Sequence, residues 1–107
     1  METKDYLQLQ SVLDQIIRSN IDPGKDVLNE KLIALSAELG EFFNECNTWK
    51  YWKKNKTINR EKLKEEYVDI LFFMFSIAND LEITAEDIEN TYKEKWKINV
   101  ERQKNNY

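Results

Sequence analysis

The sequence contains no histidine among its 107 residues, and it has only one cysteine, one proline and two glycines. The absence of histidine excludes Ser-His-Asp triads, Cys-His dyads and zinc sites that are built on imidazole. A single cysteine, Cys46, excludes an intramolecular disulfide and fits a reducing compartment. So few glycines and prolines leave little turn chemistry for a multi-stranded β fold, and they exclude collagen-like and low-complexity classes.

Long hydrophobic runs and an excess of positive charge are also absent. The longest predominantly apolar stretch, residues 70–78, is far shorter than a membrane span, and the N-terminal residues do not resemble a signal peptide. The net charge of −4 does not favour nucleic acid as a partner. We therefore expect a cytoplasmic protein that binds neither membranes nor nucleic acid. Its 41% hydrophobic and 34% charged content fits one folded domain over residues 1–107.

The residues that are present follow a helical pattern almost throughout. Apolar side chains recur at spacings of three and four, which predicts helices at about residues 5–19, 26–47, 60–81 and 84–102. Pro23 and Gly24 separate the first two helices, and the last helix opens on a capping-box pattern from Thr84 to Asp87. The segment TWKYWKKNKTIN, residues 48–59, breaks the period and predicts a basic, aromatic connector. Short loops favour antiparallel neighbours, so we expect an all-α bundle of four main helices.

The third predicted helix carries more apolar surface than one small bundle can bury. Between residues 70 and 78 only Ser76 is polar, and Phe72, Phe73 and Phe75 point to different sides of the helix. A helix that is apolar all round must be buried all round. We therefore expect a homo-oligomer, either a dimer or a tetramer, in which a neighbouring subunit completes the site.

Two of the predicted helices carry matched pairs of acidic residues. Glu38 and Glu41 lie on the second helix and Glu66 and Asp69 on the third, each pair beside an apolar stripe. If the two stripes pack antiparallel, four carboxylates converge at the rim of the core and require a counter-charge. All-oxygen ligands select a hard cation, with Mg²⁺ first and Mn²⁺ as the alternative. The competing interpretation is a solvated acidic face, because such pairs are common on exposed helices.

At these residues the sequence resembles a known family. The order ExxE, connector, ExxD is typical of the MazG-like all-α nucleoside triphosphate pyrophosphatases, and within them the chain looks most like the all-α dimeric dUTPases. Four segments carry the resemblance in the family's order: LQLQSVLDQII, LSAELGEFFNECNTWKYWKKNK, KEEYVDILFFMFSIAND and KWKINVERQKNNY. The resemblance implies an enzyme, a dUTP diphosphatase that converts its nucleoside triphosphate substrate to dUMP and pyrophosphate with Mg²⁺.

The resemblance also implies roles for individual residues. The positions that match the metal ligands are Glu38, Glu41, Glu66 and Asp69. The positions that match phosphate contacts are Lys53, Lys56, Lys95, Asn99 and Arg102. Glu38 or Glu41 would also orient the attacking water. Gln10 matches a residue that hydrogen-bonds the uracil edge, and Trp49 or Trp52 would line the base or sugar pocket.

Two features depart from the family pattern and leave the substrate open. Only LEIT, residues 81–84, joins the third and last helices, where larger members insert further helices that help to enclose the base. Asp14 stands where the pattern usually has asparagine, and a carboxylate can accept but not donate a hydrogen bond. Asp14 could therefore accept from the amino group of cytosine, which makes dCTP an alternative substrate. Hydrolysis of another nucleotide, a catalytically silent helical interaction module, and plain core or surface roles for Trp49, Lys53 and Gln10 also fit the sequence.

Overall fold

The computed structural model describes residues 1–105, and within that range it contains four helices and no strand. The helices are α1 (Thr3–Arg18), α2 (Leu28–Cys46), α3 (Arg60–Asp80) and α4 (Ala85–Lys104). The predicted all-α class is confirmed, and each helix begins and ends within two residues of its predicted bound. Residues 106 and 107, the end of the predicted domain, lie outside the described residues. None of the four helices has the length and apolarity that crossing a membrane requires.

Local side-chain chemistry sets where the helices begin and end. Asn59 caps α3 by accepting a hydrogen bond from the backbone N–H of Lys62 at 3.1 Å. At α4 the predicted capping box is present, because the Asp87 N–H donates to the Thr84 hydroxyl and the Thr84 N–H donates to the Asp87 carboxylate. Helix α2 ends at Asn47, whose backbone is left-handed (φ 56°), a conformation that asparagine tolerates better than most residues. These caps determine which residues each helix can present to its neighbours.

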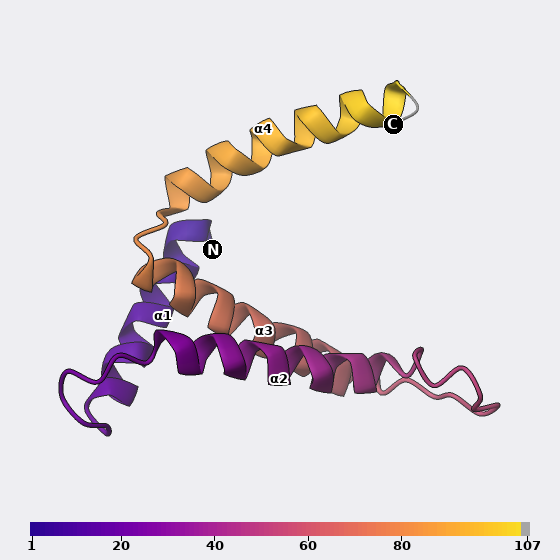
Figure 1. The fold of residues 1–107 in the computed structure, drawn as a ribbon, viewed down its shortest axis with the longest axis horizontal. Coiled ribbons are helices and arrows are strands. Elements are labelled where there is room, and N and C mark those ends of the chain that lie inside the picture. Colours follow the sequence, from indigo (N-terminus) through magenta and orange to yellow (C-terminus); the bar gives the residue numbers. More distant parts are fainter. Residues whose placement is uncertain (106–107) are drawn as a thin grey trace.

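Helix α3 is the centre of the packing. Helix α2 lies along it, and α1 crosses against its C-terminal half (Figure 1). Two side-chain hydrogen bonds join α1 to α3: the Ser76 hydroxyl donates to Asp14 at 2.7 Å, and the Asn79 amide donates to the carbonyl of Leu7 at 3.0 Å. Two helix pairs, α1 with α3 and α2 with α3, therefore share one central element.

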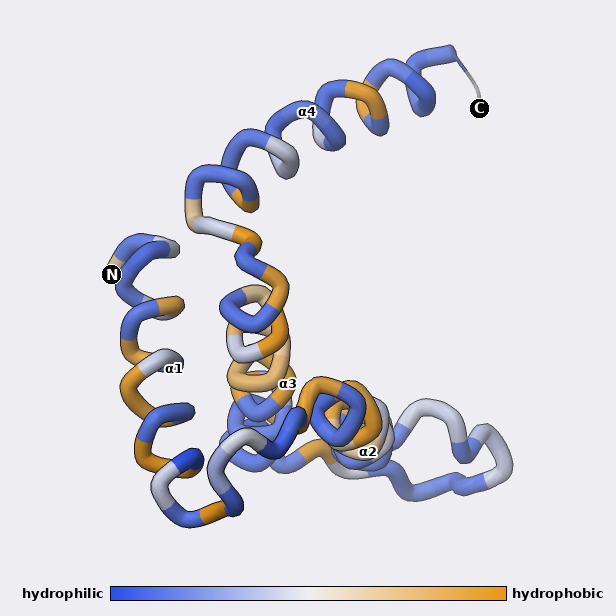
Figure 2. Tube along the Cα trace, turned by 60° about the vertical axis from the view of Figure 1, so that its left-hand side comes forward, coloured by the Kyte–Doolittle hydropathy of each residue, from blue (hydrophilic) through white to orange (hydrophobic). Residues whose placement is uncertain are grey.

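Helix α4 does not close the bundle. Among the described residues it contacts α1 alone, and it then runs away from α2 and α3 (Figures 1 and 2). The radius of gyration is 17.5 Å, whereas a compact domain of this length has a value of about 13 Å. The expected bundle of four main helices is therefore three packed helices with a projecting fourth.

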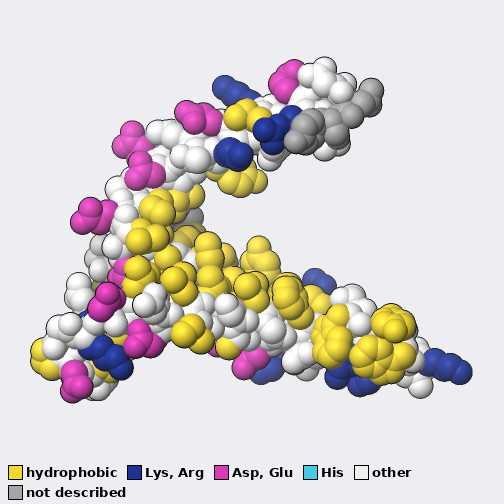
Figure 3. Space-filling view, viewed as in Figure 1, with side chains coloured by type: hydrophobic (Ala, Val, Ile, Leu, Met, Phe, Trp, Pro, Cys, Tyr) yellow, Lys and Arg dark blue, Asp and Glu magenta, His cyan; other side chains and the backbone are white. Residues whose placement is uncertain are grey.

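Much apolar surface stays exposed in one chain. Leu7, Ile77 and Ala78 are the only buried apolar side chains within residues 1–105. On α4, Tyr92 and Trp96 are 71% and 58% exposed. Figure 3 shows apolar side chains gathered on the concave side of the molecule, below the projecting α4. A single chain thus leaves uncovered the kind of surface that folded proteins usually bury.

Candidate active site

Three carboxylates meet where α2 packs on α3. Oxygen atoms of Glu38, Glu66 and Asp69 lie within 4.8 Å of one another. Glu66 and Asp69 share a face of α3 because they are three residues apart, and Glu38 approaches them from α2. The packing brings together three of the four residues that we predicted as metal ligands. We call these three residues the carboxylate cluster.

Glu41, the fourth predicted ligand, lies beside the carboxylate cluster rather than within it. It is exposed and stands about one turn further along α2. Burial raises the pKa of Glu38 above its ordinary value of 4.5, and the negative charges of Glu41, Asp69 and Glu66 raise it further. A hydrogen bond with Glu41 acts in the same direction. Without a cation, Glu38 therefore holds its proton more readily than an ordinary glutamate does.

Two buried oxygens of the carboxylate cluster lack hydrogen-bond partners among the described residues. Glu66 is only 5% exposed, and its Oε1 pairs with the Lys62 ammonium at 3.2 Å, a hydrogen bond that raises the pKa of Lys62. Oε2 of Glu38 and Oε2 of Glu66 are buried without a hydrogen-bond partner among the described residues. Buried charged oxygens without partners are costly in free energy. An all-oxygen set of this kind fits a hard divalent cation such as Mg²⁺ or Mn²⁺.

A cavity of about 630 Å³ opens between α1, α2 and α3. Its lining includes Ala34 and Phe73, which stand four residues from Glu38 and Asp69 along α2 and α3. Four residues are about one helical turn. The volume lies within the range of small-molecule sites. The cavity and the carboxylate cluster are therefore neighbours on the same pair of helices.

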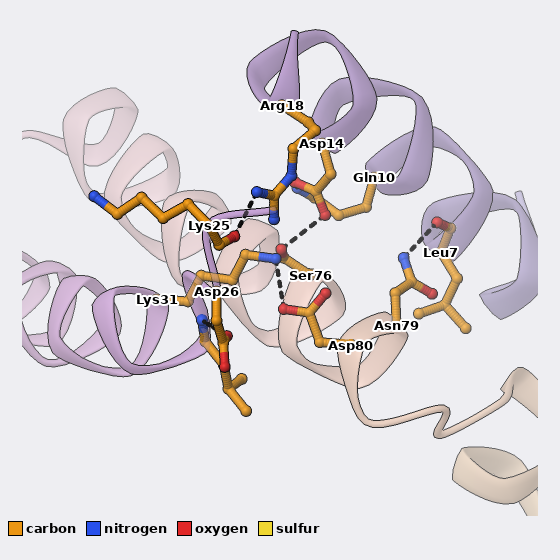
Figure 4. A network of polar contacts seen from close by, with 11 residues as sticks. Leu7, Gln10, Asp14, Arg18, Lys25, Asp26, Lys31, Ser76, Asn79 and Asp80 are labelled. Atoms are coloured by element: carbon orange, nitrogen blue, oxygen red, sulfur yellow. Dashed lines mark hydrogen bonds and ion pairs between the residues drawn. The ribbon is translucent and has the colours of Figure 1, made fainter. Parts of the chain in front are cut away.

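One wall of this cavity is a hydrogen-bonded chain between α1 and α3 (Figure 4). The Gln10 amide nitrogen donates to Asp14 Oδ1 at 2.9 Å, and the Ser76 hydroxyl donates to Asp14 Oδ2 at 2.7 Å. Gln10 and Ser76 are 5% and 2% exposed. Both residues that we predicted to read the base thus reach the cavity. Ser76 was missed, and its one signal in the sequence is that it interrupts an otherwise apolar stretch.

The predicted aromatic and basic residues of the connector are on the surface. Trp49 and Trp52 meet edge to face with ring centroids 5.9 Å apart, and each is at least half exposed. Trp49 also lines a shallow hollow together with Glu41. Lys53 and Lys56 are exposed. The beginning of the connector, at Thr48 and Trp49, therefore borders Glu41.

The predicted phosphate contacts of α4 stand apart from the carboxylate cluster of their own chain. Lys95, Asn99 and Arg102 all lie on α4, which contacts neither α2 nor α3 within residues 1–105. Lys95 and Asn99 are exposed, and Arg102 lines a hollow formed by α4 and its C-terminal end alone. A single chain does not unite these residues with the cluster.

Comparison with known proteins agrees with the sequence resemblance. A family model described as dUTPase matches residues 2–85 and 74–107, which together take in nearly the whole chain. The two matched segments overlap at residues 74–85, across the end of α3 and the short link to α4. No curated protein and no solved structure matches the chain significantly.

Proposed function

This chain belongs to the dUTPase family, and on that premise we propose how its residues hydrolyse dUTP to dUMP and pyrophosphate. The observation that carries the proposal is the carboxylate cluster, which lies one helical turn from a cavity of nucleoside size. The cluster would serve the triphosphate, and the cavity would hold the base and the sugar. Hydrolysis of dUTP follows from membership of the family, whereas we infer the roles of individual residues from their positions.

Glu38, Glu66 and Asp69 would hold the metal. Two of their oxygens are buried without partners among the described residues, and every donor is an oxygen, which suits Mg²⁺ with Mn²⁺ as the alternative. When bound, the ion supplies positive charge that neutralises phosphate oxygens and polarises the phosphorus under attack. Lys53 and Lys56, in the exposed connector, would add charge against the remaining phosphate oxygens.

We assign the attacking water to Glu41, because it borders the carboxylate cluster without belonging to it. The oxygen of a water held by Glu41 forms a bond to a phosphorus of the α–β anhydride, and the bridging P–O bond breaks to release pyrophosphate. One proton of that water passes to Glu41, the other stays on the new P–O group, and the broken bond leaves its electron pair on the departing phosphate oxygen. Glu38, the other candidate for this role, has a buried oxygen without a partner among the described residues, which suits a ligand better.

The cavity between α1, α2 and α3 would hold the deoxyuridine. Gln10 faces it as a buried amide and would hydrogen-bond the uracil edge. Trp49 and Trp52 are exposed aromatic surfaces near the Glu41 end, and they would cover the part of the nucleotide that leaves the cavity. The favoured substrate is dUTP, and dCTP is the alternative because Asp14 lies beside Gln10.

Helix α4 would act on a second copy of the chain, within a homodimer or a homotetramer. It leaves its own α2 and α3 uncovered, and it carries exposed Tyr92 and Trp96 that need a surface to pack on. Lys95 and Asn99 project from the same helix, and the ammonium group of Lys95 is complementary in charge to an acidic cluster. An α4 laid over the partner's α2 and α3 would bring Lys95, Asn99 and Arg102 to the partner's phosphates.

Pyrophosphate release from dUTP, dCTP, dTTP and ATP, each with Mg²⁺ or with EDTA, tests the reaction and the metal site. We expect Mg²⁺-dependent release above all from dUTP. Asp69→Asn should lower the rate by well over tenfold, since loss of a ligand is at least as severe as loss of a residue that orients one. Asp22→Asn, in the exposed link between α1 and α2, is the matched control and should keep the wild-type rate. A rate that survives EDTA or Asp69→Asn would contradict the metal site.

Subunit complementation tests the role of α4. Asp69→Asn and Lys95→Ala should each be inactive as homo-oligomers. If Lys95 acts on the partner's site, a mixed dimer holds one site with both defects and one site with neither. A refolded equimolar mixture should then regain about a quarter of the wild-type activity, because half of the dimers are mixed and each has one intact site. No gain on mixing would show that Lys95 acts within its own chain or not at all.

A further inference from the structure

We propose that Lys62 is a positioning residue of the metal site, which holds one oxygen of Glu66 and so makes Glu66 a one-oxygen ligand that favours Mg²⁺ over Ca²⁺. The inference rests on the proposed function, in which Glu38, Glu66 and Asp69 hold the metal. It goes beyond that function in two respects. It assigns a role to Lys62, which neither the acidic pattern nor the family resemblance singled out, and it names a cation that the site rejects.

The two oxygens of Glu66 have different surroundings. Oε1 pairs with the Lys62 ammonium at 3.2 Å, whereas Oε2 is buried and has no hydrogen-bond partner among the described residues. Glu66 is 5% exposed, so little water reaches either oxygen. Lys62 therefore occupies one oxygen of Glu66 and leaves the other for a cation.

The stability of α3 itself does not explain the position of Lys62. It stands in the first turn of α3, where the helix dipole disfavours a cation, and lysine four residues before glutamate is the weaker order for an ion pair. Its backbone is nevertheless fixed, since the Lys62 N–H donates to the Asn59 side chain at 3.1 Å. Lys64 offers a contrast, because it pairs with a glutamate that precedes it, Glu61, and both side chains are largely exposed. What distinguishes the Lys62 pair is the buried carboxylate that it meets.

A carboxylate with one available oxygen suits a small cation better than a large one. Mg²⁺ binds oxygens at about 2.0–2.1 Å in a near-octahedral shell and keeps several waters, whereas Ca²⁺ takes about 6–8 oxygens at about 2.3–2.6 Å and can bind both oxygens of one carboxylate. While Lys62 holds Oε1, Glu66 does not offer both oxygens, so Ca²⁺ loses a donor that Mg²⁺ does not need. Removal of the Lys62 ammonium would free Oε1 for Ca²⁺.

The charge of Lys62 acts on both ions alike and can be separated from this geometric role. An ammonium beside the carboxylate cluster repels any cation, so its removal strengthens the binding of Mg²⁺ and Ca²⁺ by similar factors, because both ions carry two charges. The ratio of the two dissociation constants cancels this contribution. A change in the ratio therefore reports how the oxygens of Glu66 are used.

The experiment follows Mn²⁺ bound to the nucleotide-free protein by electron paramagnetic resonance, and then its displacement by Mg²⁺ or by Ca²⁺. The wild type is compared with Lys62→Met, Lys62→Ala, Lys62→Arg and the matched control Lys64→Met, each checked for helicity by circular dichroism. The ratio of the Ca²⁺ to the Mg²⁺ dissociation constant should fall by about tenfold in Lys62→Met and Lys62→Ala, the smaller end of what residues that orient metal ligands contribute. Lys62→Arg keeps a donor for Oε1 and should retain the wild-type ratio, as should Lys64→Met.

An unchanged or raised ratio in both Lys62→Met and Lys62→Ala overturns the inference, and so does an equal fall in Lys64→Met. Pyrophosphate release from dUTP separates this failure from that of the proposed function. If the ratio is unchanged and Mg²⁺-dependent release occurs, only the role of Lys62 is wrong. If the ratio falls and no release occurs, Lys62 acts at the metal site and the proposed hydrolysis is wrong. If the wild type neither binds Mn²⁺ nor releases pyrophosphate, the metal site is wrong and the inference fails with it.

Discussion

Replacing Glu38 with glutamine should stabilise the metal-free protein and abolish its response to Mg²⁺. Oxygens of Glu38 lie within 4.8 Å of oxygens of both Glu66 and Asp69. Two unit charges at that separation repel by about 0.9 kcal/mol in water and by about 3.5 kcal/mol at an effective dielectric constant of about 20. Glu38→Gln removes two such repulsions and leaves the backbone of α2 unchanged.

The stability that Glu38→Gln gains should lie toward the lower of these two repulsion energies, because Glu38 is only half-buried and solvent screens part of the repulsion. We expect about 1–2 kcal/mol, which corresponds to a rise in Tm of about 5–10 °C for a domain of this size. At saturating Mg²⁺ the wild type should instead be more stable than Glu38→Gln. A ligand at about 100 times its Kd stabilises the wild type by about 2.7 kcal/mol, and a variant that has lost a ligand forgoes that gain.

Thermal unfolding followed by circular dichroism, at one fixed protein concentration, measures both effects. The wild type, Glu38→Gln and the exposed control Glu89→Gln on α4 are each melted in EDTA and in Mg²⁺. Glu89→Gln should follow the wild type in both buffers. The reasoning is refuted if Glu38→Gln melts at or below the wild type in EDTA, or if Mg²⁺ raises the two Tm values equally.

Three further predictions concern pH, assembly and α4. The pKa of Glu38 is raised above 4.5, so just above pH 4.5 Glu38 is still partly protonated in the folded metal-free protein but has lost its proton in the unfolded chain. As the pH falls toward 4.5, Glu38 becomes neutral like the glutamine of Glu38→Gln, and the amount by which the wild type is less stable than this variant should shrink. Urea unfolding at several pH values measures the deficit, and a constant difference contradicts the pKa shift. Trp96→Glu places a charge on the exposed apolar side of α4 and should lower the mass found by light scattering, whereas an unchanged oligomer would exclude Trp96 from an interface. Thr84→Ala removes the N-cap hydroxyl of α4 and should reduce helical ellipticity, while Thr57→Ala in the connector should not.

The helices could be predicted from the sequence because their signals are local. Apolar spacing and the capping box at Thr84 depend on a few neighbouring residues, and the structure contains both. The projection of α4 could not be predicted in the same way. Tyr92 and Trp96 indicate an apolar face, but a periodic pattern does not say whether that face packs on its own chain or on another. The length of the link at residues 81–84 likewise leaves the direction of α4 undetermined.

The candidate site shows the same division between local and tertiary information. Spacing alone put Glu66 and Asp69 on one face of α3, and it put Glu38 and Glu41 on one face of α2. Which of the two α2 residues meets the α3 pair depends on the rotation of α2 about its axis, and packing selects Glu38. Ser76 was not predicted as a site residue for a related reason, since its hydrogen bond to Asp14 exists only where α1 crosses α3.

Helix α3 contributes residues to both parts of the candidate site, the carboxylate cluster and the cavity. Ser76, which lines the cavity, stands seven residues beyond Asp69, which belongs to the carboxylate cluster. Seven residues of α-helix advance about 10 Å along the axis. In the proposed binding mode, the distance between the base and the phosphates is therefore set by one continuous helix. A change at Asp14 should therefore leave metal affinity unaltered, because among the described residues α1 contacts α3 but not α2.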